Sequence, residues 1–391
     1  MSAHDYDVTI IGGGIHGVGV AQAAAAAGHR VCLLEARELA AGTSSKSSKL
    51  IHGGLRYLES FEFGLVRESL RERTTLLRIA PELVRLVPFL IPIYGTTTRR
   101  PYEIRAGLTL YALLAGLGPG ARFGSVPRER WDSLDGLRLD DLQHVFRYHD
   151  AQTDDAALTR AVMRSAQELG AELRQPAELI RATRLDHGYD VLYAQGGMTR
   201  GLSTTVLVNA GGPWAEIVRA KVEPRPAGFA IDLVGGTHIE LPGKVTSGCF
   251  YTEAPDDRRA VFTIPWKGHT MVGTTERFHE GDPATVAPSD DEVEYLRRTY
   301  LHYFPDGDAT VIDAWAGLRV LQRKEGAAFK RTRETVFRTD GPGLVNYLAI
   351  YGGKLTGYRA TAEKVLERLA TTLPERRPLA RTDELPLTPE R

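Results

Sequence analysis

The chain has 391 residues, with 49 basic and 49 acidic side chains and therefore a formal net charge of zero. This balance gives no electrostatic signature of nucleic-acid binding, and the length is enough for a large core and for two domains. The two cysteines, Cys32 and Cys249, lie far apart and have no metal-like or redox-like neighbours. We expect two buried free thiols in a reducing, cytoplasmic compartment, and we predict no metal site.

The N-terminal sequence lacks a basic region followed by a long apolar run, so no signal peptide is predicted. The two most apolar stretches, residues 82–94 and 107–118, are too short for a transmembrane helix. We therefore expect a cytoplasmic protein. Peripheral contact with the inner face of the cytoplasmic membrane stays open.

The first elements along the chain are a strand, a glycine turn, a helix, a second strand and an acid. The β-branched run at 7–11 suits a buried parallel strand, and an alanine-rich helix follows and ends near Gly28. The second strand, RVCLL, ends on Glu35. Because G-x-G-x-x-G stands between the first strand and the helix, the full context of a dinucleotide-binding fingerprint is present.

Each residue of the fingerprint has a physical role. Gly12 permits the tight turn, Gly14 lets a pyrophosphate approach, and Gly17 lets the helix pack closely on the strand. The N-terminus of the helix offers free N–H groups to the phosphates. Glu35 would accept hydrogen bonds from a ribose and would repel a 2′-phosphate, which disfavours NADP but leaves both NAD and FAD open.

Beyond Glu35 the sequence departs from a contiguous NAD-binding fold. The serine-rich loop GTSSKSSKLIHGGLRY occupies residues 42–57, and a helix is predicted over about 63–79. The proline-punctuated sequence that follows is expected to be irregular.

The pattern of a nucleotide-binding domain returns twice more. An amphipathic helix is predicted from Asp154 or Asp155 to about Gly170. Residues 204–218 and 346–370 each repeat the order strand, double glycine, helix. Separated pieces with a shared pattern indicate one nucleotide-binding domain that is interrupted by insertions.

This arrangement resembles the FAD-dependent glycerol-3-phosphate dehydrogenases, within the wider amino-acid-oxidase-like flavoenzymes. The resemblance extends over nearly the whole chain and rests on several long motifs in the same order. The most specific are TSSKSSKLIHGGLRYLE, VNAGGPW, GTHIELP, FTIPWKGHTMVGTTE, AGLRVL and YGGKLTGYR.

The resemblance implies an α/β fold, α+β overall, in which a Rossmann-like FAD-binding domain is assembled from discontinuous segments. A substrate domain with an antiparallel sheet completes it. We assign residues 1–85, 150–225 and 313–391 to the FAD-binding domain, and residues 86–149 and 226–312 to the substrate domain.

The resemblance also implies which residues surround the FAD. The serine-rich loop is expected to wrap the flavin, and the start of the C-terminal helix is expected to face its pyrimidine end and to stabilise negative charge on it. The residues expected to bind the cofactor are Gly12, Gly14, Ile15, His16, Gly17, Glu35, Ala36, Thr43, Ser44, Ser45, Ser47, Ser48, Lys49, His52, Gly53, Gly54, Leu55, Ala177, Ala210, Gly211, Trp214, Gly317, Gly353, Lys354, Leu355 and Thr356.

A phosphorylated alcohol is a dianion at its phosphate, and arginine and lysine are its natural ligands. By resemblance, Arg56, Tyr57, Arg319 and Lys354 are placed at the substrate, with Arg319 and Lys354 also counted as catalytic. Arg333 matches a family arginine as well, although further basic residues crowd it.

The base that takes the hydroxyl proton is less defined by the sequence. His238, in GGTHIELP, matches a family position near the substrate, and a histidine suits proton abstraction near neutral pH. His52 also matches a family position, and its role could be either that of the base or that of orienting the cofactor. His238 is our candidate for the base.

Two departures from the family pattern stand out. The family usually has a basic residue two places before Thr237, where this chain has Gly235, so one positive charge of the site is expected to be missing. Typical members continue into a further helical domain, whereas this sequence stops after ELPLTPER, which we expect to be a frayed end.

The resemblance predicts an FAD-dependent oxidoreductase of glycerol metabolism. It would oxidise sn-glycerol 3-phosphate, or a close phosphorylated alcohol, to the ketone (dihydroxyacetone phosphate) and pass the electrons to a quinone or another acceptor. One alternative is an oxidoreductase acting on 2-hydroxy acids or amines, in which an arginine would clamp a carboxylate. The other is a flavin-binding module without turnover. Oligomeric state is not predicted.

Overall fold

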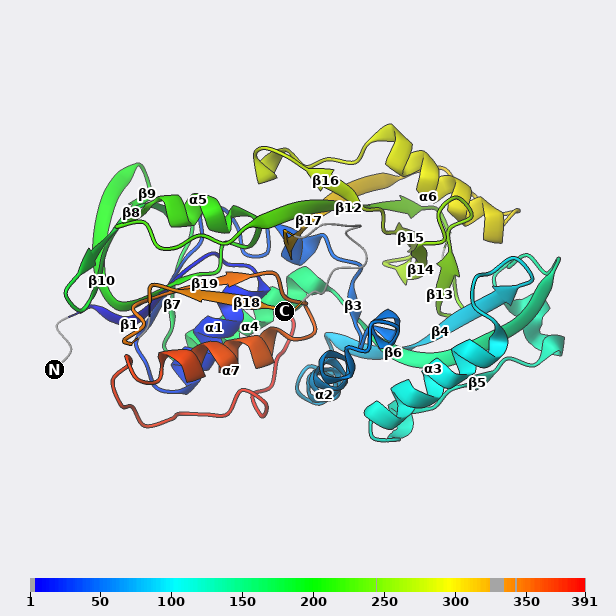
Figure 1. Ribbon diagram of the computed structural model, residues 1–391, viewed down its shortest axis with the longest axis horizontal. Coiled ribbons are helices and arrows are strands. Elements are labelled where there is room, and N and C mark those ends of the chain that lie inside the picture. Colours follow the sequence, from blue (N-terminus) through cyan, green and yellow to red (C-terminus); the bar gives the residue numbers. More distant parts are fainter. Residues whose placement is uncertain (1–3, 244, 324–333, 342, 391) are drawn as a thin grey trace.

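The computed structural model describes residues 4–243, 245–323, 334–341 and 343–390. They form two large sheets, which lie toward opposite ends of an elongated molecule (Figure 1). In Figure 1 the first sheet and its helices α1, α4 and α7 lie at the left, and the second sheet with helices α2, α3 and α6 lies at the right. The helices are α1 (Ile15–Ala26), α2 (Phe63–Ile79), α3 (Pro101–Leu114), α4 (Asp155–Glu168), α5 (Ala215–Ala220), α6 (Asp290–Tyr303) and α7 (Tyr358–Leu369).

The first sheet has a parallel centre made of fully buried strands. Strand β1 pairs in parallel with β2 and β10, β2 pairs with β7, and β10 pairs with β19. Every residue of β1, β2 and β19 is buried, as expected where helices cover both faces of a parallel sheet. The strands, in the order β11-β8-β9-β10-β1-β2-β7 with β19 on β10 and β18 on β19, are β1 (Tyr6–Ile11), β2 (Val31–Leu34), β7 (Glu172–Arg174), β8 (Glu178–Leu185), β9 (Gly188–Gln195), β10 (Met198–Asn209), β11 (Val222–Glu223), β18 (Val336–Thr339) and β19 (Tyr347–Tyr351).

Helix α1 lies between α4 and α7 and carries small side chains that let both pack closely. All of its residues except His16 are buried, and most are alanine, glycine or valine. The amide of Gln22 donates a 2.9 Å hydrogen bond to the hydroxyl of Ser165 on α4, which satisfies both buried polar groups. The glycine turn before α1 is therefore held on a densely packed support.

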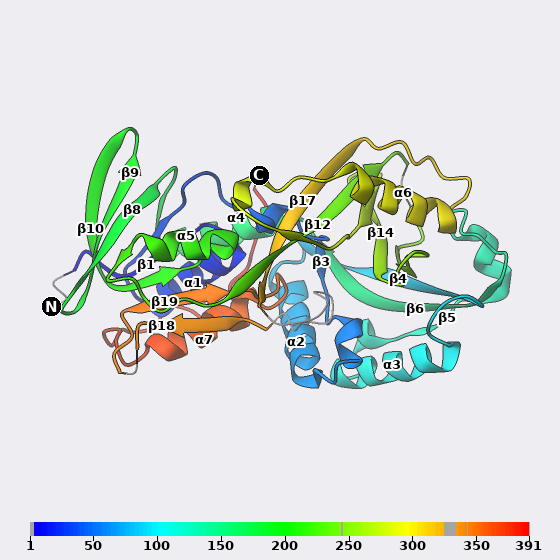
Figure 2. The same ribbon diagram turned by 45° about the horizontal axis from the view of Figure 1, so that its top comes forward.

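The second sheet is mixed and mostly antiparallel. Helices α2 and α3 pack beside β4 and β6, and α6 packs on β12, β14 and β15. Strands β12 and β17 run antiparallel over ten paired positions, and Figure 2 shows them side by side between the two ends of the molecule. The strands, in the order β16-β12-β15-β14-β13-β4-β6-β3 with β17 on β12 and β5 on β6, are β3 (Leu50–Ile51), β4 (Val84–Tyr94), β5 (Gly124–Ser125), β6 (Leu142–Thr153), β12 (Ile231–Leu241), β13 (Cys249–Glu253), β14 (Ala260–Trp266), β15 (His269–Gly273), β16 (Arg277–His279) and β17 (Asp313–Gln322).

Short 3-10 helices complete the connections. The first of them, η1, lies in the serine-rich loop, and η2 directly follows the double glycine of that loop. Among the described residues, none of the helices has the length and apolar character needed to cross a membrane. The 3-10 helices are η1 (Thr43–Ser45), η2 (Leu55–Leu58), η3 (Pro119–Ala121), η4 (Arg128–Ser133), η5 (Gly212–Trp214) and η6 (Pro283–Thr285).

Most elements expected from the sequence are present, and one expectation is wrong. The helix predicted over 63–79 is α2, and the helix predicted from Asp154 or Asp155 is α4, with Asp154 as its N-cap. The proline-punctuated sequence after α2 is not irregular, because it forms β4 and then α3. Pro88 and Pro92 are four residues apart, so their missing N–H groups fall on the same side of the strand, while the N–H groups of Phe89 and Ile91 point to the other side; all these residues stay paired in register with β6.

The predicted domain boundaries stay a prediction. Two strands inside the segments predicted to bind FAD, β17 and β3, belong to the second sheet. β17, which was assigned with the FAD-binding segments, pairs with β12 in the second sheet. The short strand β3 also belongs to that sheet, through its pairing with β6. Residues 317–321 of β17 and Leu50 of β3 themselves line the cavity described below.

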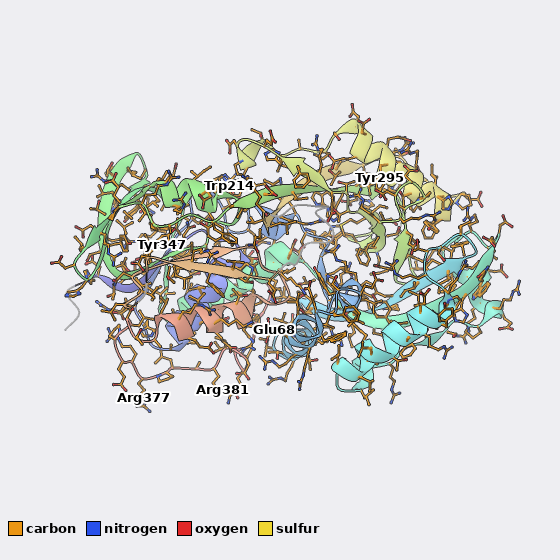
Figure 3. All side chains as sticks on the ribbon, viewed as in Figure 1. Glu68, Trp214, Tyr295, Tyr347, Arg377 and Arg381 are labelled. Atoms are coloured by element: carbon orange, nitrogen blue, oxygen red, sulfur yellow. The ribbon has the colours of Figure 1, made fainter. Side chains whose placement is uncertain are left out.

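The expectation of a frayed C-terminal end is also wrong. Leu387 is only 2% exposed and belongs to the core between α1, α2 and α4, and its N–H bonds to the carbonyl of Ile79 at 2.7 Å. Upstream, Arg376 forms an ion pair of 2.9 Å with the buried Asp7. The side chains of Arg377 and Arg381 point away from the molecule (Figure 3). The segment therefore packs on the first sheet's helices without regular secondary structure.

Leu387→Ala tests whether this segment stabilises the fold. Because the leucine is buried in the core, we expect the free energy of unfolding in urea to fall by about 2–4 kcal/mol. Leu379→Ala in the same segment is the matched control, since Leu379 is 62% exposed and its truncation should change that free energy by less than about 0.5 kcal/mol. Equal effects of the two variants would contradict a packed tail.

Candidate functional site

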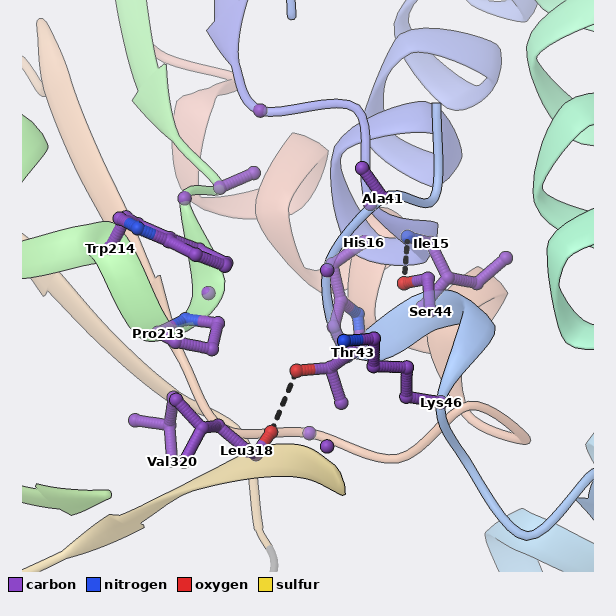
Figure 4. Close-up of a pocket in the computed structure, with 18 of the residues that line it drawn as sticks. Ile15, His16, Ala41, Thr43, Ser44, Lys46, Pro213, Trp214, Leu318 and Val320 are labelled. Atoms are coloured by element: carbon purple, nitrogen blue, oxygen red, sulfur yellow. Dashed lines mark hydrogen bonds between the residues drawn. The ribbon is translucent and has the colours of Figure 1, made fainter. Parts of the chain in front are cut away.

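A cavity of about 640 Å³ lies between the carboxyl end of the first sheet and the strands β12 and β17. Its wall combines the fingerprint turn, the serine-rich loop, β17 and the double glycine before α7, and Figure 4 shows part of it. Most residues that the sequence placed at the cofactor or the substrate line this one cavity. They are Gly12, Gly14, Ile15, His16, Glu35, Ala36, Thr43, Ser44, Ser47, Ser48, His52, Tyr57, Ala177, Ala210, Gly211, Trp214, His238, Gly317, Arg319, Gly353, Lys354, Leu355 and Thr356.

The remaining predicted site residues do not line the cavity. Gly17 packs against the carbonyl of Gly12, where a Cβ would collide with the turn, so it acts through the turn's shape. Arg333 lies outside the described residues. The others stand behind the lining: Ser45, Lys49, Gly53, Gly54, Leu55 and Arg56.

The fingerprint turn is held by the acid at the end of β2. Gly12 has a φ of +110°, which a residue with a side chain rarely adopts, and a Cβ there would also lie 2.7 Å from the carbonyl oxygen of Ala210. The carboxylate of Glu35 accepts hydrogen bonds from the backbone N–H groups of Gly13 at 2.6 Å and Arg37 at 2.8 Å. The acid predicted to meet a ribose therefore also fixes the turn beside it.

The N-terminal end of the serine-rich loop is hydrogen-bonded to both walls of the cavity. The hydroxyl of Ser44 accepts a 2.9 Å hydrogen bond from the N–H of Ile15 at the start of α1, and the hydroxyl of Thr43 donates to the carbonyl of Leu318 at 2.7 Å (Figure 4). These two bonds connect the helix of the first sheet with β17 of the second. The loop therefore bridges the two walls of the cavity.

A buried ion pair supports this loop from behind. The ammonium of Lys49 lies 2.7 Å from the carboxylate of Asp155, and both residues are at most 5% exposed. The same carboxylate accepts hydrogen bonds from the N–H and the hydroxyl of Ser47, at 3.0 and 2.6 Å. Burial raises the pKa of Asp155, although the charge of Lys49 opposes this shift. Lys49, predicted at the cofactor, is thus occupied in holding the loop.

The double glycine before η2 rests on a second buried network, which the sequence did not reveal. The N–H of Gly53 donates to the hydroxyl of Tyr111 at 2.8 Å, and this hydroxyl donates to Asp150 at 2.6 Å. Arg73 pairs with the same carboxylate at 2.6 Å. A Cβ at Gly53 would lie 2.5 Å from the Tyr111 oxygen, so the close approach requires glycine. Nothing local in the sequence links these residues, which come from α2, α3 and β6.

Several basic side chains lie in the wall of the cavity or next to it. Arg319 pairs with Glu276 at 2.7 Å and donates to the hydroxyl of Thr274 at 3.2 Å. The ammonium of Lys354 lies 4.1 Å from the ring centre of Tyr57, whose other neighbour is the guanidinium of Arg56 at 5.0 Å. Lys46 lines the cavity as well, although the sequence did not single it out. The wall of the cavity therefore carries several positive charges.

His238 is enclosed in the wall of the cavity. It is 2% exposed, its Nε2 lies 2.9 Å from the hydroxyl of Ser48, and its ring stacks on Trp315 with centroids 5.7 Å apart. Burial, together with the positive charges of Arg319 and Lys49, lowers the pKa of His238 to about 3. The imidazole is therefore neutral and able to accept a proton.

The wall of the cavity fits FAD. The first residues of α1, Ile15 and His16, line the cavity together with the N-cap Gly14, which has no side chain to block a pyrophosphate at the helix N-terminus. The ring nitrogen Nδ1 of His16 is buried and has no hydrogen-bond partner among the described residues, so a polar ligand is needed to satisfy it. The volume lies within the roughly 300–1,000 Å³ usual for cofactor sites. Fold and site together define a dinucleotide-binding protein of the Rossmann-like class.

The comparisons with known proteins define the family. The family model of FAD dependent oxidoreductases matches residues 7–368, and the chain belongs to this family. It is 38% identical over 382 residues to a glycerol-3-phosphate dehydrogenase of Pseudomonas aeruginosa, covering 94% of this chain and 72% of that protein. It is 35% identical to a D-erythritol 1-phosphate dehydrogenase of Brucella abortus, covering 94% of this chain and 74% of that protein.

A solved structure agrees with these sequence relatives. The glycerol-3-phosphate dehydrogenase of Bacillus halodurans, complexed with FAD, superposes with a TM-score of 0.74 at 26% identity, covering 96% of this chain and 67% of that chain. The α/β fold and the dependence on FAD, both expected from the sequence, are confirmed. The protein is an FAD-dependent oxidoreductase.

Two of the histidines that line the cavity, His16 and His238, predict acid sensitivity. Burial lowers the pKa of His16 to about 4, and that of His238 is about 3, whereas an unfolded histidine titrates near 6.5. Between those values the unfolded chain binds protons that the fold excludes. Stability is therefore fully present above about pH 6.5 and is lost as the pH falls, by at most about 1.4 kcal/mol per pH unit for each histidine.

His16→Asn should reduce this slope in the FAD-free protein, measured as the free energy of urea unfolding between pH 4.5 and 6.5, a window set by those pKa values. His187→Asn, at an exposed position, is the control and should leave the slope unchanged. The explanation fails if both variants keep the slope of the parent protein.

Proposed function

We propose that the protein oxidises sn-glycerol 3-phosphate, or a close phosphorylated alcohol, to the corresponding ketone. The observation that carries this proposal is the charge of the cavity, whose lining includes Lys46, Arg319 and Lys354. A phosphate dianion needs several cationic donors, whereas a carboxylate needs fewer and a bare flavin-binding module needs none. The names of the two relatives, both phosphorylated-alcohol dehydrogenases, support the same substrate class.

FAD, when bound, accepts the hydride from the carbinol carbon, and the protein supplies position, charge and a proton acceptor. In this proposal Arg319, Lys354, Arg56 and Tyr57 hold the phosphorylated substrate. His238 receives the hydroxyl proton at Nε2, the nitrogen that faces Ser48. A pKa of about 3 makes the free imidazole a weak base. The dianion offsets the neighbouring positive charges and so raises that pKa when substrate binds.

The electron acceptor and the location belong to the same proposal. Electrons pass to a quinone or to another acceptor, oxygen included, and the protein works in the cytoplasm with peripheral contact to the membrane. Both cysteines, Cys32 and Cys249, are free and buried, which suits a reducing compartment.

The choice of substrate is tested by anaerobic bleaching of the flavin absorbance. We expect glycerol 3-phosphate or erythritol 1-phosphate to bleach the FAD-loaded protein, and glycerol without phosphate to be ineffective at the same concentration. Because the relatives act on alcohols of different length, the two phosphates rank the chain lengths that this cavity accepts. Bleaching only by 2-hydroxy acids or amines would favour the carboxylate alternative, and bleaching by no compound would favour a non-catalytic module.

Arg319→Ala should weaken the binding of phosphorylated substrates by about 10–100-fold and leave FAD bound, because one charge-assisted contact is lost. The readout is the substrate concentration that half-saturates flavin reduction, with FAD content measured in parallel. Glu276→Gln is the matched control, since it removes the partner at 2.7 Å but keeps the guanidinium. Equal loss of flavin in Arg319→Ala would contradict the role given to this arginine.

A further inference from the structure

Two neighbouring glycines in the wall of the cavity let other residues approach the backbone of two strands closely. Gly236 of β12 and Gly317 of β17 are paired across the two strands, and both line the cavity. A Cβ on Gly317 would lie 2.9 Å from the Cβ of Lys46, and a Cβ on Gly236 would lie 2.9 Å from Nη2 of Arg319. One basic residue therefore packs over each glycine. We call this pair of glycines the glycine floor.

Lys46 differs from the other cations of the cavity in its partners. Arg319 has Glu276 and Lys354 has the ring of Tyr57, as described above. The side chain of Lys46 points into the cavity (Figure 4) and is half-buried. Among the described residues it forms neither an ion pair nor a side-chain hydrogen bond. A positive charge held at a cavity wall without a counterion is suited to an anionic ligand.

We propose that Lys46 is a further binding residue for the phosphoryl group of the substrate, acting together with Arg319 across the glycine floor. This inference rests on the proposed function and deepens it. Gly236 and Gly317 are cross-strand neighbours, which lie about 4.5–5.5 Å apart. The Cβ of Lys46 packs over one of them and the guanidinium of Arg319 over the other, so the two cations belong to one stretch of wall and can contact different oxygens of one phosphate in the cavity.

The cofactor phosphates are the less favoured partner of Lys46. The pyrophosphate is served by the N-terminus of α1, whose N-cap Gly14 stands at the fingerprint turn. Lys46 instead packs on Gly317 of β17. Gly317 is two residues from Arg319 and therefore lies on the same face of that strand. A contact with the flavin is the rival outcome, and the experiment below separates the two.

The test uses the FAD-loaded protein and Lys46→Met, which keeps the apolar stem and removes the charge. Two ligands are titrated: inorganic phosphate, followed by the change in flavin absorbance, and glycerol 3-phosphate, followed by anaerobic flavin reduction. We expect the dissociation constant of phosphate and the half-saturating concentration of glycerol 3-phosphate each to rise about 10-fold. The limiting reduction rate, the FAD content and the flavin midpoint potential should change little.

Two further variants sharpen this test. Lys46→Arg should recover most of the lost affinity, because it restores a cation at the same wall. Lys364→Met on α7 removes one positive charge outside the cavity and should leave both titrations unchanged.

Each outcome decides between the inference and its rivals. Unchanged phosphate binding in Lys46→Met, or no phosphate binding by the parent protein, overturns the inference. A shifted midpoint potential with unchanged phosphate binding also overturns it, because Lys46 then acts on the flavin. If the parent flavin is reduced by no phosphorylated alcohol while Lys46→Met still loses phosphate, the proposed function fails and the anion site stands. If glycerol 3-phosphate reduces parent and variant alike at the same concentration, the inference fails alone.

Discussion

The buried ion pair between Lys49 and Asp155 is the contact on which the cavity depends most. It fixes the serine-rich loop, and this loop supplies Thr43, Ser44 and Lys46 to the wall. Removing one partner of such a pair leaves a buried charge without compensation, which usually costs about 3–5 kcal/mol. The pair therefore couples the position of the loop to the packing of α4, and α4 packs in turn on α1, the helix that follows the fingerprint turn.

The chain is neutral as a whole, but its charges are unevenly placed. Near Glu35 the lining of the cavity carries charges of both signs, because Lys221 pairs there with Glu178 at 2.8 Å. The lining also includes three further cations, Lys46, Arg319 and Lys354. The net charge gives no signature of nucleic-acid binding, and it has no bearing on the small anion that these cations suit. Local charge, set by which strands meet, decides the chemistry of the site.

The sequence predicted those features that depend on residues close together in the chain. The fingerprint is a local pattern in which each glycine meets a steric need of its own turn, so it could be read without the fold. The network of Tyr111, Asp150 and Arg73 could not, because its members come from three elements that only folding brings together. β4 was missed because prolines usually indicate a break in secondary structure. The packing of the C-terminal tail was missed because the tail is mostly polar and has a single deeply buried leucine, Leu387.

The low pKa of His238 gives the proposed site a way to recognise its substrate beyond affinity. Burial and the charges of Arg319 and Lys49 keep the free imidazole neutral, so it is a poor base until an anion enters. A phosphorylated alcohol brings two negative charges toward the same cations and thereby raises the pKa of His238. The substrate thus strengthens the base that takes the proton from the substrate's hydroxyl group. An unphosphorylated alcohol brings no such charge. In the proposed mechanism it is therefore penalised twice, once in binding and once in proton transfer, although its reacting carbon is the same.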